Sequence, residues 1–124
     1  MPDTPLELVL TGEGSPERAE ALALALLERR LVACASLLPG RSLYHWQGRI
    51  ETGAEVLLLL KTRAEHLEAL RVALHELHSY ETPEWIHWSA STAGDYGDWL
   101  GAALSPGGGP QAPAGTPGGG GPAG

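Results

Sequence analysis

The composition of the last 20 residues limits how much of this chain can fold. Residues 105–124 hold 9 of the 17 Gly and 5 of the 10 Pro, and they contain no charged, aromatic or large aliphatic residue. Such a segment buries too little apolar surface to offset its chain entropy, so we predict that it is disordered. Residues 1–104 are then expected to form a single domain of ordinary size.

Residues 1–30 predict a strand followed by a helix. Residues 6–10 alternate loosely between apolar and polar, which is typical of a strand. Ser15 and Pro16 then form a helix start, because serine caps the first turn and proline fits its first position. The helix is expected to end near Arg29 and Arg30, whose cations suit the negative end of the helix dipole.

The next segment, residues 31–61, predicts a β-hairpin. The apolar run 31–38 is interrupted by Pro39 and Gly40, and the aromatic-rich segment 43–46 resumes the strand. Gln47-Gly48 is a plausible turn into a second long strand that ends at residues 56–61. The two arms are long for a domain of this size.

A second helix, a fourth strand and a short final helix are expected after residue 61. Thr62 and Glu65 have the spacing of a capping box, and leucines follow as the buried stripe of a helix at positions 67, 70, 74 and 77. Pro83 ends that region, because the residue before proline avoids helical angles. Residues 84–89 alternate like a strand, and 92–104 can hold a helix anchored by Trp99 and Leu100.

The resulting order, β-α-β-β-α-β plus a short helix, predicts the α+β class. It is the ferredoxin-like split β-α-β pattern, an antiparallel sheet with helices on one face. The four Trp and three Tyr, several of them on predicted strands, indicate that the other face is covered. We expect oligomerisation through that face or through strand edges. The alternative is that the final helix covers it alone.

The charge pattern excludes several kinds of partner. The net charge is −7, and the Lys and Arg residues form no cluster, so we expect no binding to nucleic acid or to an anionic membrane. The apolar runs, residues 56–60 among them, are too short to cross a bilayer, and residues 1–5 lack the features of a signal peptide. The single cysteine, Cys34, favours a reducing cytoplasm, with an interchain link or a reactive thiol left open. Known enzyme motifs are missing, so no catalytic activity is expected.

The chain resembles the CutA family of divalent-cation-tolerance proteins. The matching positions are spread over most of residues 6–104, and their order and spacing make the resemblance specific. They are residues 31–36 (LVACAS), 39–48 (PGRSLYHWQG) and 78–84 (HSYETPE), with Glu55, Lys61, Tyr96, Trp99 and Leu100.

The resemblance implies a cytoplasmic homotrimer with a ferredoxin-like fold that binds divalent cations, copper most often. The trimer and fold also look like those of PII-type signal proteins. Two positions depart from the family pattern: Ser36 stands where Asn is common, and His78-Ser79-Tyr80 stands where His-Pro-Tyr is common. We expect the missing proline to loosen the turn that orients His78 and Tyr80.

Three residues are the predicted metal ligands. Cys34 offers a soft thiolate, His78 an imidazole and Glu84 a carboxylate after Pro83. Each has a structural alternative: a buried small hydrophobe for the cysteine, a charge at a helix end for the histidine, and a solvated acid for the glutamate. His75, three residues before His78, is a weaker candidate for the same site.

A second set of matched residues predicts a cleft between subunits. The set consists of Tyr44, Trp46, Lys61, Tyr80 and Trp99. Aromatic side chains are also the expected core of an interface. Lys61 is harder to explain by packing, because a lysine that ends a buried strand needs a carboxylate partner or a wet cleft. An anionic ligand near Lys61 is therefore conceivable.

The sequence thus predicts a cytoplasmic homotrimer that binds a divalent cation, Cu²⁺ above others, and that serves in metal tolerance. The alternative is a PII-like trimeric module that senses a small molecule or binds a protein, with metal binding incidental.

Overall fold

A computed structural model describes residues 2–106. Disorder is predicted for residues 105–124, and residues 107–124 lie outside the described range. The strands are β1 (Thr4–Glu13), β2 (Cys34–Trp46), β3 (Arg49–Thr62) and β4 (Ile86–Thr92). The helices are α1 (Pro16–Glu28), the short 3-10 helix η1 (Ala64–His66), α2 (Leu67–Leu77) and α3 (Gly94–Ala103).

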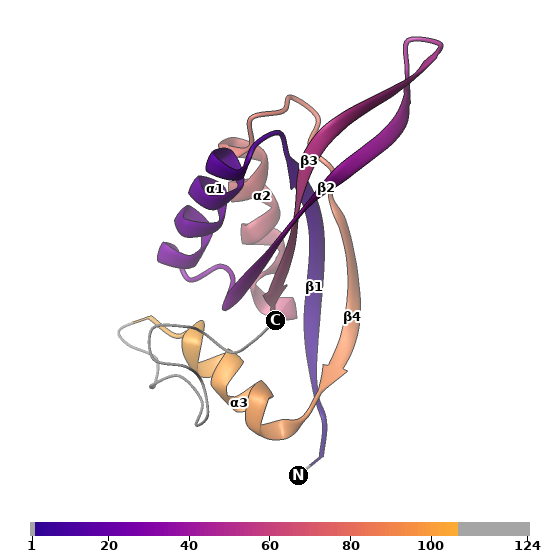
Figure 1. Cartoon of the computed structure of the whole chain (residues 1–124). Helices are drawn as coiled ribbons and strands as arrows, with labels where there is room; N and C mark the ends of the chain where they lie inside the picture. The colour runs from indigo at the N-terminus through magenta and orange to yellow at the C-terminus, as the bar shows by residue number, and fades with distance from the viewer. Residues whose placement is uncertain (1, 107–124) are drawn as a thin grey trace.

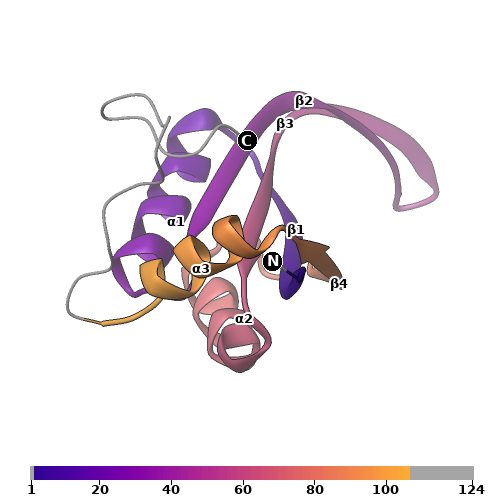
Figure 2. The same ribbon diagram turned by 90° about the horizontal axis from the view of Figure 1, so that it is seen from below.

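The strands form one sheet in the order β2-β3-β1-β4, and every neighbouring pair is antiparallel. Helices α1 and α2 lie on one face of this sheet, and α3 crosses the end opposite the tip of the β2–β3 hairpin (Figure 1, Figure 2). The predicted α+β, ferredoxin-like split β-α-β fold is confirmed.

Local signals account for the start of α1 and for the hairpin turn. The Ser15 hydroxyl accepts the Arg18 amide at 3.2 Å, and Pro16 occupies the first turn, as predicted. Gln47 and Gly48 both have positive φ, 49° and 75°, which is the backbone of a two-residue hairpin turn that matches strand twist. β2 and β3 then pair without a break from Trp46–Arg49 to Cys34–Lys61.

Three boundaries differ from the sequence prediction. Pro39 does not interrupt β2 but pairs with Val56, because β2 is an edge strand and can lack an amide donor on one side. The capping box is wrong: Thr62 is the last residue of β3, and its hydroxyl donates to the Leu31 carbonyl at 2.8 Å instead of capping a helix. β4 begins at Ile86, two residues later than predicted.

The core lies between the helices and the sheet. Val9, Leu58 and Leu60 from the strands are fully buried against Leu26 of α1 and Leu74 of α2. A smaller cluster at the other end joins Leu6 of β1 to Leu100 of α3 and to Leu104, which directly follows α3. Leu77, predicted in the buried stripe of α2, is instead 37% exposed.

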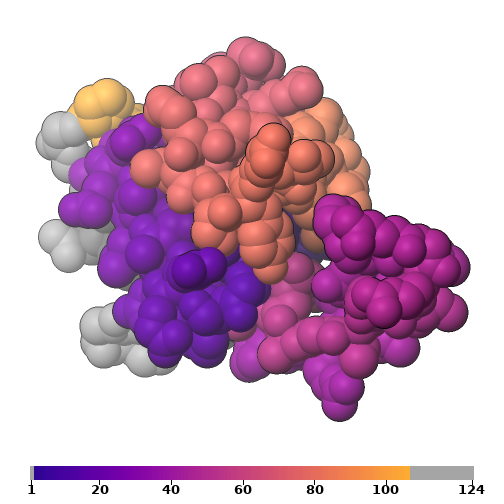
Figure 3. Space-filling view, turned by 90° about the horizontal axis from the view of Figure 1, so that it is seen from above, coloured from indigo at the N-terminus to yellow at the C-terminus, as the bar shows by residue number. Residues whose placement is uncertain are grey.

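The sheet face away from α1 and α2 is only partly covered. Strand alternation places Leu38, Ile86 and Trp88 on this open face, and they are 50%, 47% and 42% exposed. The alternative that α3 alone covers this face is therefore wrong, because α3 buries only the end near Leu6. Seen from above, the β2–β3 hairpin projects away from the rest of the surface (Figure 3).

Candidate functional site

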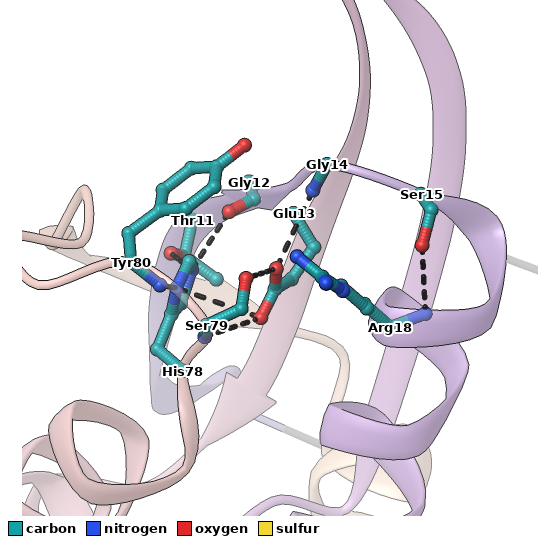
Figure 4. Close-up of polar contacts among 9 residues, drawn as sticks. All are labelled: Thr11, Gly12, Glu13, Gly14, Ser15, Arg18, His78, Ser79 and Tyr80. Atoms are coloured by element: carbon teal, nitrogen blue, oxygen red, sulfur yellow. Dashed lines mark hydrogen bonds and ion pairs between the residues drawn. The ribbon is translucent and has the colours of Figure 1, made fainter.

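The His78 ring lies at the end of α2 and is packed against the end of β1. Its Nε2 is 2.7 Å from the Gly12 carbonyl and 3.3 Å from the Thr11 hydroxyl, and its Nδ1 accepts the Tyr80 amide at 3.0 Å (Figure 4). Because an amide can only donate, Nδ1 carries no proton, and the ring proton on Nε2 points at Gly12. Both ring nitrogens thus have protein partners in this conformation.

Glu13 is a fully buried carboxylate beside this histidine. It accepts the Ser79 amide at 3.0 Å, the Ser79 hydroxyl, and the Gly14 amide at 3.4 Å, and one oxygen is 3.5 Å from Nδ1 of His78. Proline in place of Ser79 could provide neither donor. Contrary to our expectation of a looser turn, Ser79 ties the turn after α2 to the end of β1 (Figure 4).

A further carboxylate, Glu55, lies near the Tyr80 phenol, and Glu84 lies near Glu55. The Tyr80 ring packs on the His78 ring at 4.8 Å, and burial followed by the charges of Glu55 and Glu13 raises the pKa of its phenol. Glu55 accepts the Ser42 hydroxyl at 2.5 Å and lies over Gly12, where an added Cβ would be 2.7 Å from its carboxyl carbon. Burial, followed by the charge of Glu55, raises the pKa of Glu84. We call Glu13, Glu55, Glu84 and Tyr80 the acidic cluster.

Cys34 and Lys61 lie elsewhere, at the α3 end of the open face. They are directly paired across β2 and β3, and the Lys61 ammonium is 3.7 Å from the Cys34 sulfur and 3.4 Å from the Ser36 hydroxyl. Burial, followed by the charge of Cys34 and a hydrogen bond to it, raises the pKa of Tyr96. Trp99 packs against Tyr96 with ring centroids 5.4 Å apart.

The predicted site residues, except Trp46 at the hairpin turn, therefore form two groups within one chain. His78, Glu84, Tyr80 and Tyr44 belong near the acidic cluster, since Tyr44 also acts on the Tyr80 pKa. Cys34, Lys61 and Trp99 form the other group.

The register of β1 separates the two groups. Lys61 pairs with Leu8, whereas His78 contacts Gly12, four residues or about 13 Å further along β1. Among residues 2–106, no three His, Cys, Asp or Glu side chains are grouped to hold a metal ion.

Two residues that sequence reasoning did not select prove central to the turn. Glu13 and Ser79 connect positions 66 residues apart. The available signal was a charged residue at the end of a mostly apolar strand, just before Gly14.

A family model for the CutA1 divalent ion tolerance protein matches residues 7–103. The chain belongs to the CutA1 family.

Among curated relatives of this CutA1-family chain, the divalent-cation tolerance protein CutA of Pectobacterium atrosepticum is 47% identical over 88 residues, 69% of this chain and 80% of that protein. The protein of the same name from Escherichia coli strain K12 / DH10B is 42% identical over 94 residues, 73% of this chain and 84% of that protein.

Solved CutA structures have the same fold as this CutA1-family chain. CutA from Synechococcus elongatus matches with a TM-score of 0.81 at 37% identity, covering 84% of this chain and 95% of that one. The protein from Archaeoglobus fulgidus, which is called a periplasmic divalent cation tolerance protein, matches with a TM-score of 0.78 at 30% identity, covering 81% and 99%. The family is named for tolerance of cations and not for a catalytic activity. None of the helices between residues 2 and 106 is long and apolar enough to cross a membrane.

Proposed function

We propose that this chain acts as a homotrimer that binds divalent cations, Cu²⁺ above others, and contributes to metal tolerance in the cytoplasm without catalysing a reaction. The names of its relatives support a role with divalent cations. The net charge of −7 supports it further, because a negative surface raises the local cation concentration.

The observation that carries the proposal is the crowding of carboxylates in the acidic cluster. Burial and the nearby charge of Glu55 raise the pKa of Glu84, so its charged form is disfavoured where it stands. A divalent cation bound beside Glu84 and Glu55 would offset both effects.

The proposed ligands are His78 and Glu84 at one site, with Cys34 supplied by a neighbouring copy. Within one chain Cys34 is distant from His78, so a shared site needs a second subunit. Binding through Nδ1 of His78 also requires the Tyr80 amide to turn away. Tyr44, Trp46, Lys61, Tyr80 and Trp99 would then line the clefts between subunits.

The trimer is proposed from the apolar surface that one chain leaves exposed. Ile86 and Trp88 are exposed on the open face, and Leu43, Trp46 and Ile50 are exposed on the hairpin by 72%, 58% and 71%. An exposed apolar area of this kind is typical of a protein interface.

Calorimetric titration with Cu²⁺ tests the metal site. Cys34→Ser, His78→Gln and Glu84→Gln should each weaken binding, whereas Glu65→Gln, which changes an exposed acid on η1, should leave it unchanged. Near-ultraviolet circular dichroism checks that each variant is folded. Wild-type affinity in all three ligand variants would contradict the proposed ligand set, and no heat of binding in the wild type would contradict metal binding itself.

The exposure of Tyr44 and Trp46 on the hairpin, 50% and 58%, favours one second candidate: a PII-like trimeric module that binds a small molecule or a protein. Native mass spectrometry of freshly purified protein separates the two, since it shows whether a metal or an organic ligand remains bound. Cell fractionation tests the cytoplasmic location.

A further inference from the structure

Helix α3 is held to the rest of the domain by two arginines that bind its backbone. The Arg63 guanidinium donates to the Gly97 carbonyl at 2.7 Å, and Arg30 donates to the Ala103 carbonyl at 2.8 Å. These bonds hold the two ends of α3, which crosses the end of the sheet (Figure 2). Leu100 and Leu104 add an apolar contact with Leu6.

The contact under α3 is close, but two buried polar groups in it lack hydrogen-bond partners among residues 2–106. An added Cβ at Gly97 would lie 1.9 Å from the Thr4 hydroxyl, and one at Gly101 would lie 2.7 Å from the Arg63 guanidinium. Both glycines therefore let the helix approach closely. Yet the Thr4 hydroxyl and Nε of Arg63 are buried without a hydrogen-bond partner among residues 2–106. Opening this contact to water would satisfy both groups, which lowers the cost of opening.

The side chains of α3 also reach the Cys34–Lys61 pair. Tyr96 hydrogen-bonds to Cys34 and packs on Trp99, and Trp99 joins the cluster around Leu6. The phenol of Tyr96 thus lies against the Cys34 thiol while α3 is docked, and Cys34 is then half-buried.

We propose that α3 detaches from the rest of the domain as a unit and that this opening controls access to the Cys34 thiol. The hydrogen bonds from Arg30 and Arg63 hold α3 in its docked position. Segments with few buried apolar contacts and unsatisfied polar groups open at a lower free energy than the whole domain. The apolar cluster under α3 is smaller than the leucine core between α1, α2 and the sheet, and two unsatisfied polar groups lie beside it. The inference concerns thiol access alone and stands whether or not Cys34 binds a metal.

Arg30→Gly is the sharpest test, because it removes one of the two arginine hydrogen bonds to α3 without straining the backbone. Arg30 has a φ of 59°, the left-handed conformation that glycine adopts most easily. The full chain is treated with a chelator, and the rate at which Cys34 reacts with Ellman's reagent is followed in native buffer and in low urea. Arg29→Ala, an exposed neighbour at the end of α1, is the matched control.

The wild-type thiol should react more slowly than the same thiol in unfolded protein, with little dependence on low urea. Arg30→Gly should react about tenfold faster, the effect of losing a charged hydrogen bond worth about 1.4 kcal/mol, and Arg29→Ala should match the wild type. Hydrogen exchange should show the amides of residues 96–104 opening before those of β1. An unchanged rate in Arg30→Gly, a wild-type rate equal to that of the unfolded chain, or exchange of α3 only together with β1 would each overturn the proposal.

Discussion

Replacing Ser79 tests whether its two bonds to Glu13 hold the turn after α2. Ser79→Ala removes the hydroxyl donor and leaves one oxygen of a fully buried carboxylate with only the Gly14 amide, at 3.4 Å. A hydrogen bond to a charged group contributes about 1.5–3 kcal/mol, so the free energy of unfolding should fall by about 2 kcal/mol.

Ser79→Pro gives the decisive comparison. It introduces proline, which the resemblance to the CutA family implies at this position. His78, with φ −68° and ψ 145°, already has the extended backbone that precedes proline. Proline reduces the entropy of the unfolded chain, a gain of about 0.4–1 kcal/mol. It also removes the amide bond to Glu13, 3.0 Å long. The net loss should be about 3 kcal/mol, larger than for alanine.

Urea unfolding, followed by tryptophan fluorescence at one protein concentration, measures both variants. Ser91→Ala, an exposed serine on β4, should change the free energy of unfolding by no more than about 0.5 kcal/mol. If Ser79→Pro is as stable as the wild type or more so, the Ser79–Glu13 bonds do not hold the turn and the reasoning is refuted.

Three other perturbations follow from the same structure. Glu84→Gln should raise the free energy of unfolding at neutral pH, because the raised pKa of Glu84 means that its charged form opposes folding. That gain should vanish as the pH falls below about 4.5, where the carboxyl is protonated in both states, and a gain that persists in urea titrations at that pH would argue against this cause. Leu60→Ala should cost about 2–5 kcal/mol in urea unfolding, since Leu60 is fully buried in the core, and a cost below 1 kcal/mol would mean that the core is loosely packed there. Trp88→Glu should lower the mass measured by light scattering from three chains towards one, because the open face would carry a charge. An unchanged trimer mass would remove Trp88 from the interface, and a wild-type mass of one chain would refute the trimer.

Local chemistry was enough to predict most elements of the fold. Ser15-Pro16 and Gln47-Gly48 act within a few residues, and the structure uses both as expected. The capping box at Thr62 is wrong because a partner distant in sequence, the Leu31 carbonyl, takes its hydroxyl. Competition of that kind is not visible in a local pattern.

The grouping of the site residues could not be predicted because it depends on strand register. Cys34 is opposite Lys61, and Lys61 is opposite Leu8, which sets the thiol four residues away from the contact of His78 with Gly12. Glu13 was missed for a similar reason, since its partner Ser79 is 66 residues further along the chain. Residue type identified the candidate ligands, but only the sheet determines which of them can meet.

The projecting hairpin offers a natural reporter of assembly. β3 last pairs with β1 at Val56, so residues 40–55 form a ribbon of two strands with no third strand beside them. A two-stranded ribbon is marginally stable in water, and beyond the contact of Glu55 with Gly12 a neighbouring copy in the proposed trimer would add order to it. In a dilution series that dissociates the proposed trimer, the backbone relaxation of these amides would therefore change before that of the core.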